Sequence, residues 1–362
     1  MKENLQSNIW KYALFLIANK RIFVAILGAY YLTVPGVTAQ GIGIILLAST
    51  FAGFLFEIPS GYVSDKIGHK QALVFSRLCL IASTLFLLFA TNIMFLILGG
   101  VLMSIGNAFH SGTGSAFMHE TLRGLGREEK YAEIMGKIKS IGFAIPVILM
   151  VLVPFLVDIS FRAPFAVALV IDILGLLAAA SLVIPSVPQK HVEEIGTTNF
   201  VQVVKEGYRL GFFKYAFFVG VVGGILFGVG GFRAPYQIFL EIPVIWYGVF
   251  LGIGRSFASL MLAYSGKIKK KTTIISFFEF QIALYALLIA ILGLVPIWWI
   301  IVPVFIIINA FQWGLSGVSD SYLIEVISTS KFKATLLSVE AQINGAVAGI
   351  VSFGLGFAIE RA

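Results

Sequence analysis

Apolar runs of about 20 residues, each separated from the next by a short polar segment, recur along the whole chain. A helix of that length crosses a hydrocarbon core of roughly 30 Å. Strands of a membrane β-barrel would instead alternate over about ten residues. The pattern therefore predicts an all-α polytopic membrane protein. Its eleven spans are expected near residues 9–33, 40–60, 71–91, 94–119, 135–157, 162–185, 210–232, 242–264, 273–294, 296–324 and 335–358.

The composition agrees with a membrane location. Of 362 residues, 59% are hydrophobic and 12% are charged, whereas soluble domains contain about 25% charged residues. A net charge of +8 can indicate nucleic acid, but here the Lys and Arg residues gather in alternate loops. With the N-terminus in the cytoplasm, the outer loops carry Arg162 and little else. We therefore expect a cytoplasmic N-terminus, a lipid bilayer as partner and no nucleic acid.

The longest polar stretch follows the sixth span and divides the chain. It predicts an N-terminal six-helix bundle over 1–185, a cytoplasmic linker over 186–209 and a C-terminal bundle over 210–362. A weak repeat supports two halves, since YVSDKIGHK after the second span resembles YSGKIKKK after the eighth. Internal repeats of this kind are common in transporters.

A short charged segment, EIPSGYVSDKIGHK, lies between the second and third spans on the expected cytoplasmic side. Its residues 61–70 resemble the loop motif G-x-x-x-D-R-x-G-R-R of the major facilitator superfamily. Gly61, Asp65, Gly68 and Lys70 fit that motif, whereas Lys66 and His69 replace arginine. The stretches 111–137, 237–248 and 333–342 also resemble the bacterial drug-efflux-like branch, so the resemblance covers nearly the whole chain.

The resemblance implies two pseudo-symmetric six-helix bundles around a central cavity in a bacterial-type inner membrane. It also implies alternating access by a monomer, with the first, fourth, seventh and tenth spans lining the cavity. In the gate motif (residues 61–70), Asp65 would pair with Arg77, lie near Glu120 and face the N-terminal end of span eleven. Gly61 would allow close helix approach and Gly68 a tight turn. The motif would hold the cytoplasmic side shut; alternatively, it only ends two helices.

The family has twelve helices, whereas this chain ends just after the eleventh span. We expect a truncated sequence rather than a true eleven-helix form. A further apolar run beyond residue 362 would support truncation, and a stop codon there would refute it.

Several polar residues lie within the expected spans, where they are costly and often functional. Lys20 and Arg21 fall inside the first span, so we expect at least one of them to face water or a carboxylate. Alternatively, the first helix is bent and both charges lie at the membrane surface. By resemblance, the cavity candidates on spans four and ten are Asn107, His110, Asn309, Gln312 and Trp313. Asn107 and Asn309 serve equally well as hydrogen-bonding contacts between helices.

Glu340 shares a face of span eleven with Asn344 and is the best-placed acid for proton coupling, because burial favours protonation of a carboxylate. Its alternative role is as a partner for the Lys331 and Lys333 region or for the gate motif. His110 is the second proton-coupling candidate. Among the other charged residues, Asp172 and Glu279 are expected in structural pairs and Glu57, Asp320 and Glu325 in gate networks, with Arg233 and Arg255 as weaker cavity candidates.

The chain shows no phosphate-binding G-x-x-x-x-G-K-[ST] segment, no Cys/His cluster with metal-ligand spacing and no convergent catalytic set. We therefore expect neither an enzyme nor a cofactor or metal. The function predicted is secondary active transport of small organic molecules, most simply proton-coupled, multidrug-like export. The alternatives are an organic-anion importer or uniporter, and a non-transporting membrane sensor with the same fold. A sensor, unlike a transporter, would keep its function after neutralisation of Asp65.

Overall fold

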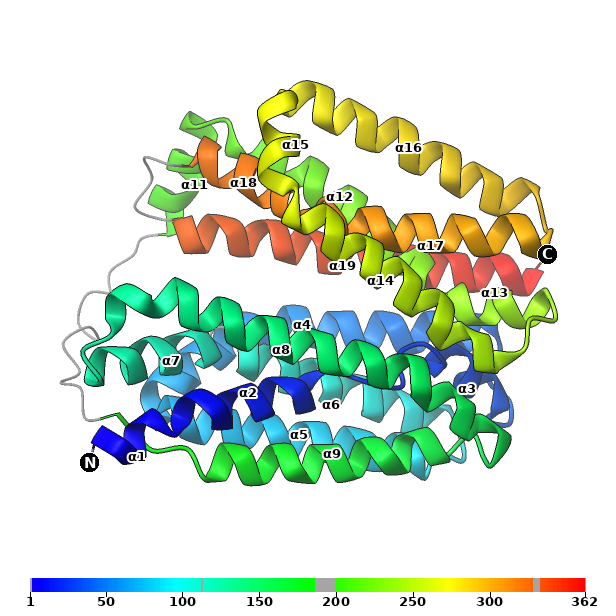
Figure 1. The fold of residues 1–362 in the computed structure, drawn as a ribbon. Coiled ribbons are helices and arrows are strands. Elements are labelled where there is room, and N and C mark those ends of the chain that lie inside the picture. The colour runs from blue at the N-terminus through cyan, green and yellow to red at the C-terminus, as the bar shows by residue number, and fades with distance from the viewer. Residues whose placement is uncertain (1, 112, 186–199, 328–332, 362) are drawn as a thin grey trace.

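The chain folds into two helical bundles that lie side by side (Figure 1). The computed structural model describes residues 2–111, 113–185, 200–327 and 333–361. The N-terminal bundle comprises α1 (Lys2–Gln6), α2 (Asn8–Asn19), α3 (Leu27–Thr33), α4 (Ala39–Ile67), α5 (His69–Leu88), α6 (Ile93–Ser111), α7 (Thr113–Gly124), η1 (Glu128–Lys130), α8 (Tyr131–Leu152), η2 (Val153–Asp158) and α9 (Ala163–Ala180). The C-terminal bundle comprises α12 (Phe212–Gly231), α13 (Arg233–Phe239), η3 (Val244–Trp246), α14 (Tyr247–Ala263), α15 (Ser265–Lys271), α16 (Ile274–Leu294), α17 (Trp298–Gly314), α18 (Ser316–Val326) and α19 (Lys333–Arg361).

The helices run between two ends of the molecule (Figure 1). The motif end carries residues 61–70 together with α1 and α15, and the opposite end carries the loops at 34–38, 159–162 and 240–243. Most of the predicted linker, residues 186–199, falls outside the described ranges. Its remainder is the short helix α11 (Phe200–Arg209) at the motif end, which buries Val203.

Ten helical segments in the described part of the chain are long and apolar enough to cross a membrane. They correspond to the second through eleventh predicted spans, and the fold class predicted from the sequence is confirmed. The gate motif is more helical than expected, because α4 continues to Ile67 and the turn falls at Gly68, where φ is 98°. Positive φ of this size favours glycine.

The prediction of a single continuous first span is wrong. The segment is split into α2 and α3, and residues 20–26 between them are not helical. Arginines satisfy the carbonyl groups that the break leaves at the end of α2. Arg77 donates hydrogen bonds to Phe15 O at 2.7 Å and to Ala18 O at 3.0 Å, and Arg21 donates to Ala18 O at 3.1 Å. The break therefore forms where two cations are available as helix caps.

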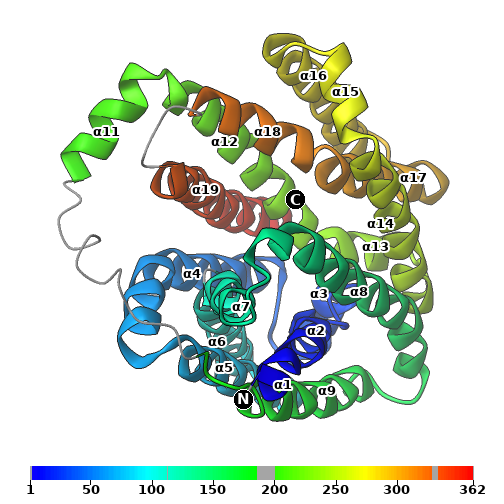
Figure 2. The same cartoon turned by 60° about the vertical axis from the view of Figure 1, so that its left-hand side comes forward.

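The two bundles share an apolar core at the opposite end. One cluster of buried residues joins Ile22, Ile42 and Met150 of the first bundle to Phe232 and Tyr247 of the second. The bundles meet there along α4 with α19 and α8 with α14 (Figure 2). The backbones of α4 and α19 approach closely, because α4 has Gly43 and α19 has Gly356 at this contact. The opposite end is therefore sealed by apolar contacts.

The motif end is built differently. Each of the other apolar clusters found among the described residues belongs to one bundle alone. Tyr12, Phe117 and Leu122 form part of the cluster at this end of the N-terminal bundle, and Phe212 and Leu336 belong to its counterpart in the C-terminal bundle. The structure thus represents a conformation closed at the opposite end, with separate bundle cores at the motif end.

Candidate functional site: a polar pocket in one bundle and a buried ion network in the other

A polar cavity of about 190 Å³, called here the C-bundle pocket, lies among α12, α16, α17, α18 and α19. Apolar residues form part of its wall, and the remaining lining residues carry amide, hydroxyl, indole or carboxyl groups. These polar residues are Gln281, Tyr285, Gln312, Trp313, Ser316, Ser319, Asp320, Glu340 and Asn344. Polar groups concentrated within apolar helices are costly unless they have a function or hydrogen-bond partners.

Two carboxyl groups, those of Asp320 and Glu340, face this pocket, and their charges are close enough to interact. Neither forms an ion pair with any residue in the described ranges. The side chains of Lys331 and Lys333, the two lysines expected near Glu340, are not among those that the structure describes. Two neighbouring carboxylates without a cation repel each other, and uptake of one proton removes that repulsion. The pocket is therefore chemically suited to binding and releasing a proton.

Glycines on α12 bring α19 into the position that points Glu340 and Asn344 at the pocket. A Cβ atom on Gly224 would lie 2.6 Å from Asn344 O, and one on Gly220 would lie 3.0 Å from Glu340 O. Small residues at such spacing let helix backbones approach closely within a membrane. The tight contact between α12 and α19 thus fixes the position of α19, which carries Glu340. It leaves no room for side chains larger than glycine at Gly220 and Gly224.

The N-terminal bundle contains a buried ion network around Asp172. Arg21 forms a bidentate pair with this carboxylate, at 2.5 Å and 2.9 Å, and the Thr84 hydroxyl donates to it at 2.6 Å. Arg77 lies 3.5 Å from the same carboxylate, is fully buried and stacks its guanidinium 4.3 Å from the Phe15 ring centroid. Arg21, which was predicted to line the cavity, is therefore one member of a buried pair with Asp172.

The predicted Asp65–Arg77 pair is not formed in this structure, because Asp172 and the α2 carbonyls occupy Arg77. Among the described residues, Asp65 instead contacts His69, with 3.3 Å between Oδ1 and Nε2. The other ring nitrogen of His69 lies 3.0 Å from Glu120 Oε2. Carboxylates only accept hydrogen bonds, so both contacts are satisfied when both ring nitrogens carry a proton.

The remaining gate-motif residues lie at the surface of the motif end. Lys66 is exposed and Lys70 is half-buried. No atom lies within 4 Å of a Cβ built on Gly61, so the close helix approach expected there is not formed in this conformation. This agrees with a motif end at which the two bundles have separate cores.

Other predicted cavity residues divide into accessible and buried groups. Lys20 and Asn107 are exposed in the middle of their spans. His110 Nδ1 accepts a hydrogen bond from the Asn19 side-chain amide at 3.4 Å, and its buried Nε2 has no hydrogen-bond partner among the described residues. Asn309 is 8% exposed and packs against Gly254 of α14, so it contacts a neighbouring helix rather than the pocket.

Gln312 and Trp313 line the C-bundle pocket, whereas the sequence analysis missed Gln281 and Tyr285 and assigned Asp320 to a gate network. A signal for Asp320 was present. Ser316 lies four residues after Gln312, and Ser319 and Asp320 lie three and four residues after Ser316, spacings that place polar groups on one helix face. Because Asp320 lies near the end of a predicted span, it was not grouped with these residues.

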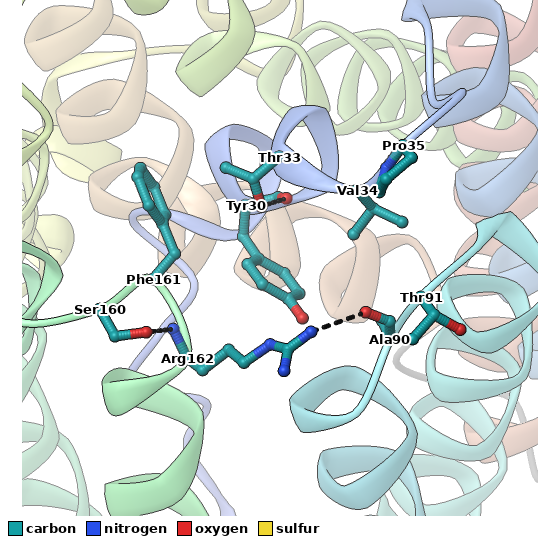
Figure 3. A pocket seen from close by; sticks show the side chains of 9 residues that line it. All are labelled: Tyr30, Thr33, Val34, Pro35, Ala90, Thr91, Ser160, Phe161 and Arg162. Carbon is teal, nitrogen blue, oxygen red and sulfur yellow. Dashed lines mark hydrogen bonds between the residues drawn. The ribbon is translucent and has the colours of Figure 1, made fainter.

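A second cavity, of about 300 Å³, opens at the opposite end (Figure 3). Tyr30, Thr33 and Arg162 are among its lining residues, and Arg162 Nη2 donates to Ala90 O at 3.4 Å. No acid lines it. It lies beyond the apolar seal between the bundles, so we assign it no role in the site.

A search of curated proteins gave no match. Among solved structures, the nucleoside transporter NupG has a TM-score of 0.78 at 14% identity, covering 99% of this chain and 91% of that chain. A bacterial homologue of the human lysosomal transporter Spinster, described as inward-facing and unoccupied, has a TM-score of 0.73 at 15% identity, with coverage of 98% and 81%.

A D-xylose–proton symporter has a TM-score of 0.62 at 13% identity, with coverage of 98% and 89%. At these identities the likenesses show the fold alone. The family model of the Major Facilitator Superfamily, however, matches residues 12–359, which is nearly the whole chain. Two helical bundles, a polar pocket within one of them and this match together establish that the chain belongs to the Major Facilitator Superfamily.

Proposed function

We propose that this protein is a proton-coupled secondary active transporter of small organic molecules. Membership of the superfamily supports secondary transport by alternating access. The observation that carries the coupling proposal is the pair of carboxyl groups, Asp320 and Glu340, that share one pocket without a cationic partner in the described ranges. A proton bound there neutralises one charge, and its release restores the repulsion.

Glu340 is well placed to link a proton to the movement of the bundles. Its helix, α19, packs on α12 within its own bundle and on α4 across the seal. Closing the motif end would withdraw water from the pocket, and an ionised carboxylate pair loses favourable hydration when water leaves. The closed state therefore binds the proton more tightly, so acidification favours closing of the motif end.

The orientation expected from the loop charges makes the motif end cytoplasmic, so this conformation corresponds to an inward-facing state. Export, the direction expected from the sequence, rests on the resemblance to the drug-efflux-like branch. Import rests on a structural neighbour named as a proton symporter. Reconstituted protein under imposed pH gradients of either sign separates the two, because an antiporter moves substrate against the proton flow and a symporter moves it with that flow.

Glu340→Gln should remove a titrating carboxyl group from the purified protein. Infrared difference spectra recorded between weakly acidic and weakly alkaline solution report the carbonyl stretch of protonated carboxylic acids. We expect the wild type to show this band and Glu340→Gln to lose most of it. Glu279→Gln is the matched control, since Glu279 is exposed on α16 outside the pocket and its removal should leave the band in place. An unchanged band in Glu340→Gln would refute the assignment of the proton site.

Asp65→Asn should weaken closing of the motif end. A carboxylate near a helix N-terminus stabilises by about 0.3–1 kcal/mol, so the closed population should fall about two- to fivefold. Spin labels at Lys130→Cys and Lys270→Cys, both exposed at the motif end, measure this population by pulsed electron resonance in a Cys79→Ser background. Glu133→Gln removes an exposed carboxylate of an i,i+4 pair and is the control. Equal closed populations in Asp65→Asn and wild type would mean that the motif only ends two helices and does not hold the motif end shut.

A further inference from the structure

We propose that the transported molecule is a small organic anion, bound by cationic side chains that meet between the two bundles. This inference rests on the proposed function and names its substrate class. The side chains are Lys20 and Lys139 of the N-terminal bundle and Arg255 of the C-terminal bundle. The anionic group is a carboxylate or a phosphate, since these are the oxygen acids that Lys and Arg side chains bind in proteins.

Lys20 and Arg255 lie deep within the spans, and Lys139 lies on the part of its span that is nearer to the motif end. Lys20 directly follows α2, so it lies about 18 Å along the helix axis from Asn8, at a rise of about 1.5 Å per residue. Arg255 occupies the middle of α14, and Lys139 lies on α8. Lys20 and Lys139 are exposed, and Arg255 is half-buried. Accessible charges at this depth face water or ligand rather than lipid, because lipid cannot solvate them.

The helices that carry these cations adjoin one another, because α8 packs against both α2 and α14. The charge of Lys20 interacts with that of Arg255 across the interface, and Lys20 and Lys139 both act on His110. Cationic groups held near one another repel, and a bound anion relieves that repulsion. The site therefore becomes complete only when both bundles contribute to it.

Within the described ranges, the protein supplies no acidic side chain that would relieve this repulsion between cations. Asp172, the acid nearest to the break in the first span, already binds Arg21 and Arg77. No ion pair within the described ranges includes Lys20, Lys139 or Arg255. Cations kept deep in the spans without acidic partners are expensive, and a ligand of opposite charge gives a reason for them.

Arg255 connects this region to the proton pocket. Its guanidinium stacks 4.0 Å from the ring centroid of Trp313, which lines the C-bundle pocket. Stacking uses the face of the guanidinium and leaves its N–H edge for two parallel hydrogen bonds to an oxygen acid. Protonation of the Asp320–Glu340 pair removes negative charge beside the bound anion, so proton and anion should strengthen each other's binding reciprocally.

The test compares anions with neutral molecules of matched shape. Thermal unfolding of the full-length purified protein is recorded with benzoate and benzamide, gluconate and glucose, and uridine monophosphate and uridine. We expect at least one anion to raise the unfolding temperature more than its neutral partner, and more strongly in weakly acidic solution. Lys20→Met should weaken binding of that anion about tenfold or more, and Arg255→Lys should also weaken it, because lysine keeps the charge but cannot form the two parallel hydrogen bonds. Lys137→Met, an exposed lysine on α8, should change nothing.

Two results would overturn the inference. One is equal or smaller stabilisation by every anion relative to its neutral partner, and the other is unchanged anion affinity in Lys20→Met protein that folds normally. Either result leaves the proposed function standing if the Glu340-dependent infrared band is present in the same preparation. Loss of that band together with retained anion binding would instead remove the proton coupling and keep the anion site.

Discussion

Asp172→Ala should destabilise the protein by about 3–5 kcal/mol, the typical cost of removing one partner from a buried ion pair. The substitution leaves the guanidinium groups of Arg21 and Arg77 without their carboxylate and removes the acceptor of the Thr84 hydroxyl. Asp172 is 1% exposed, so water cannot replace it without entering the bundle. Unfolding in a graded denaturing detergent series, followed by helical circular dichroism, measures the change.

Asp158→Ala is the matched control for this substitution, because Asp158 is exposed at the end of η2 and forms no ion pair in the described ranges. Its removal should change the stability by no more than about 0.5 kcal/mol. A similar small change for Asp172→Ala would mean that the network is hydrated in solution and does not hold the broken first span in place.

Gly356→Val should prevent the conformation described here. A Cβ atom at Gly356 would lie 2.5 Å from Ala39 O and 3.1 Å from Gly43 Cα, all within the contact between α19 and α4. Both obstacles are backbone atoms, which cannot rotate away as a side chain would. The substitution should therefore open the seal at the opposite end and shift the protein toward a state closed at the motif end.

Gly354→Val provides the control on the same helix, since no atom lies within 4 Å of a Cβ built on Gly354. The labelled pair at Lys130→Cys and Lys270→Cys reports the shift. Distances across the motif end should shorten in most Gly356→Val molecules and stay at the wild-type values in Gly354→Val. Wild-type distances in both variants would show that the α4–α19 contact does not control which end is closed.

Hydrophobic patterning predicted the spans well because each apolar run is long enough to cross a bilayer by itself. The break in the first span was not predictable from the same pattern. It depends on Asp172 and Arg77, which lie far from Arg21 in the sequence and become neighbours only when α9 packs against both α2 and α5. Local periodicity contains no information about such partners.

Only part of the candidate site could be predicted, because here too the missing information lies in contacts between distant helices. Helical spacing placed Glu340 with Asn344 and Gln312 near Trp313, and all four line the C-bundle pocket. Spacing within one helix cannot show which residue of another helix faces the same space. Asp320 was therefore separated from Glu340, although the structure brings both carboxyl groups to one pocket. The role of the gate motif and of the cavity residues stays a prediction.

The central claim is that proton uptake accompanies closing of the motif end, and its most direct test is the pH dependence of that closing in the wild-type sequence. The distance between labels at Lys130→Cys and Lys270→Cys would be measured in lipid nanodiscs from weakly alkaline to weakly acidic solution. Uptake of one proton on closing predicts that the ratio of closed to open molecules rises by up to about tenfold per pH unit on acidification. Distances that stay constant over this range, or that lengthen on acidification, would contradict the account.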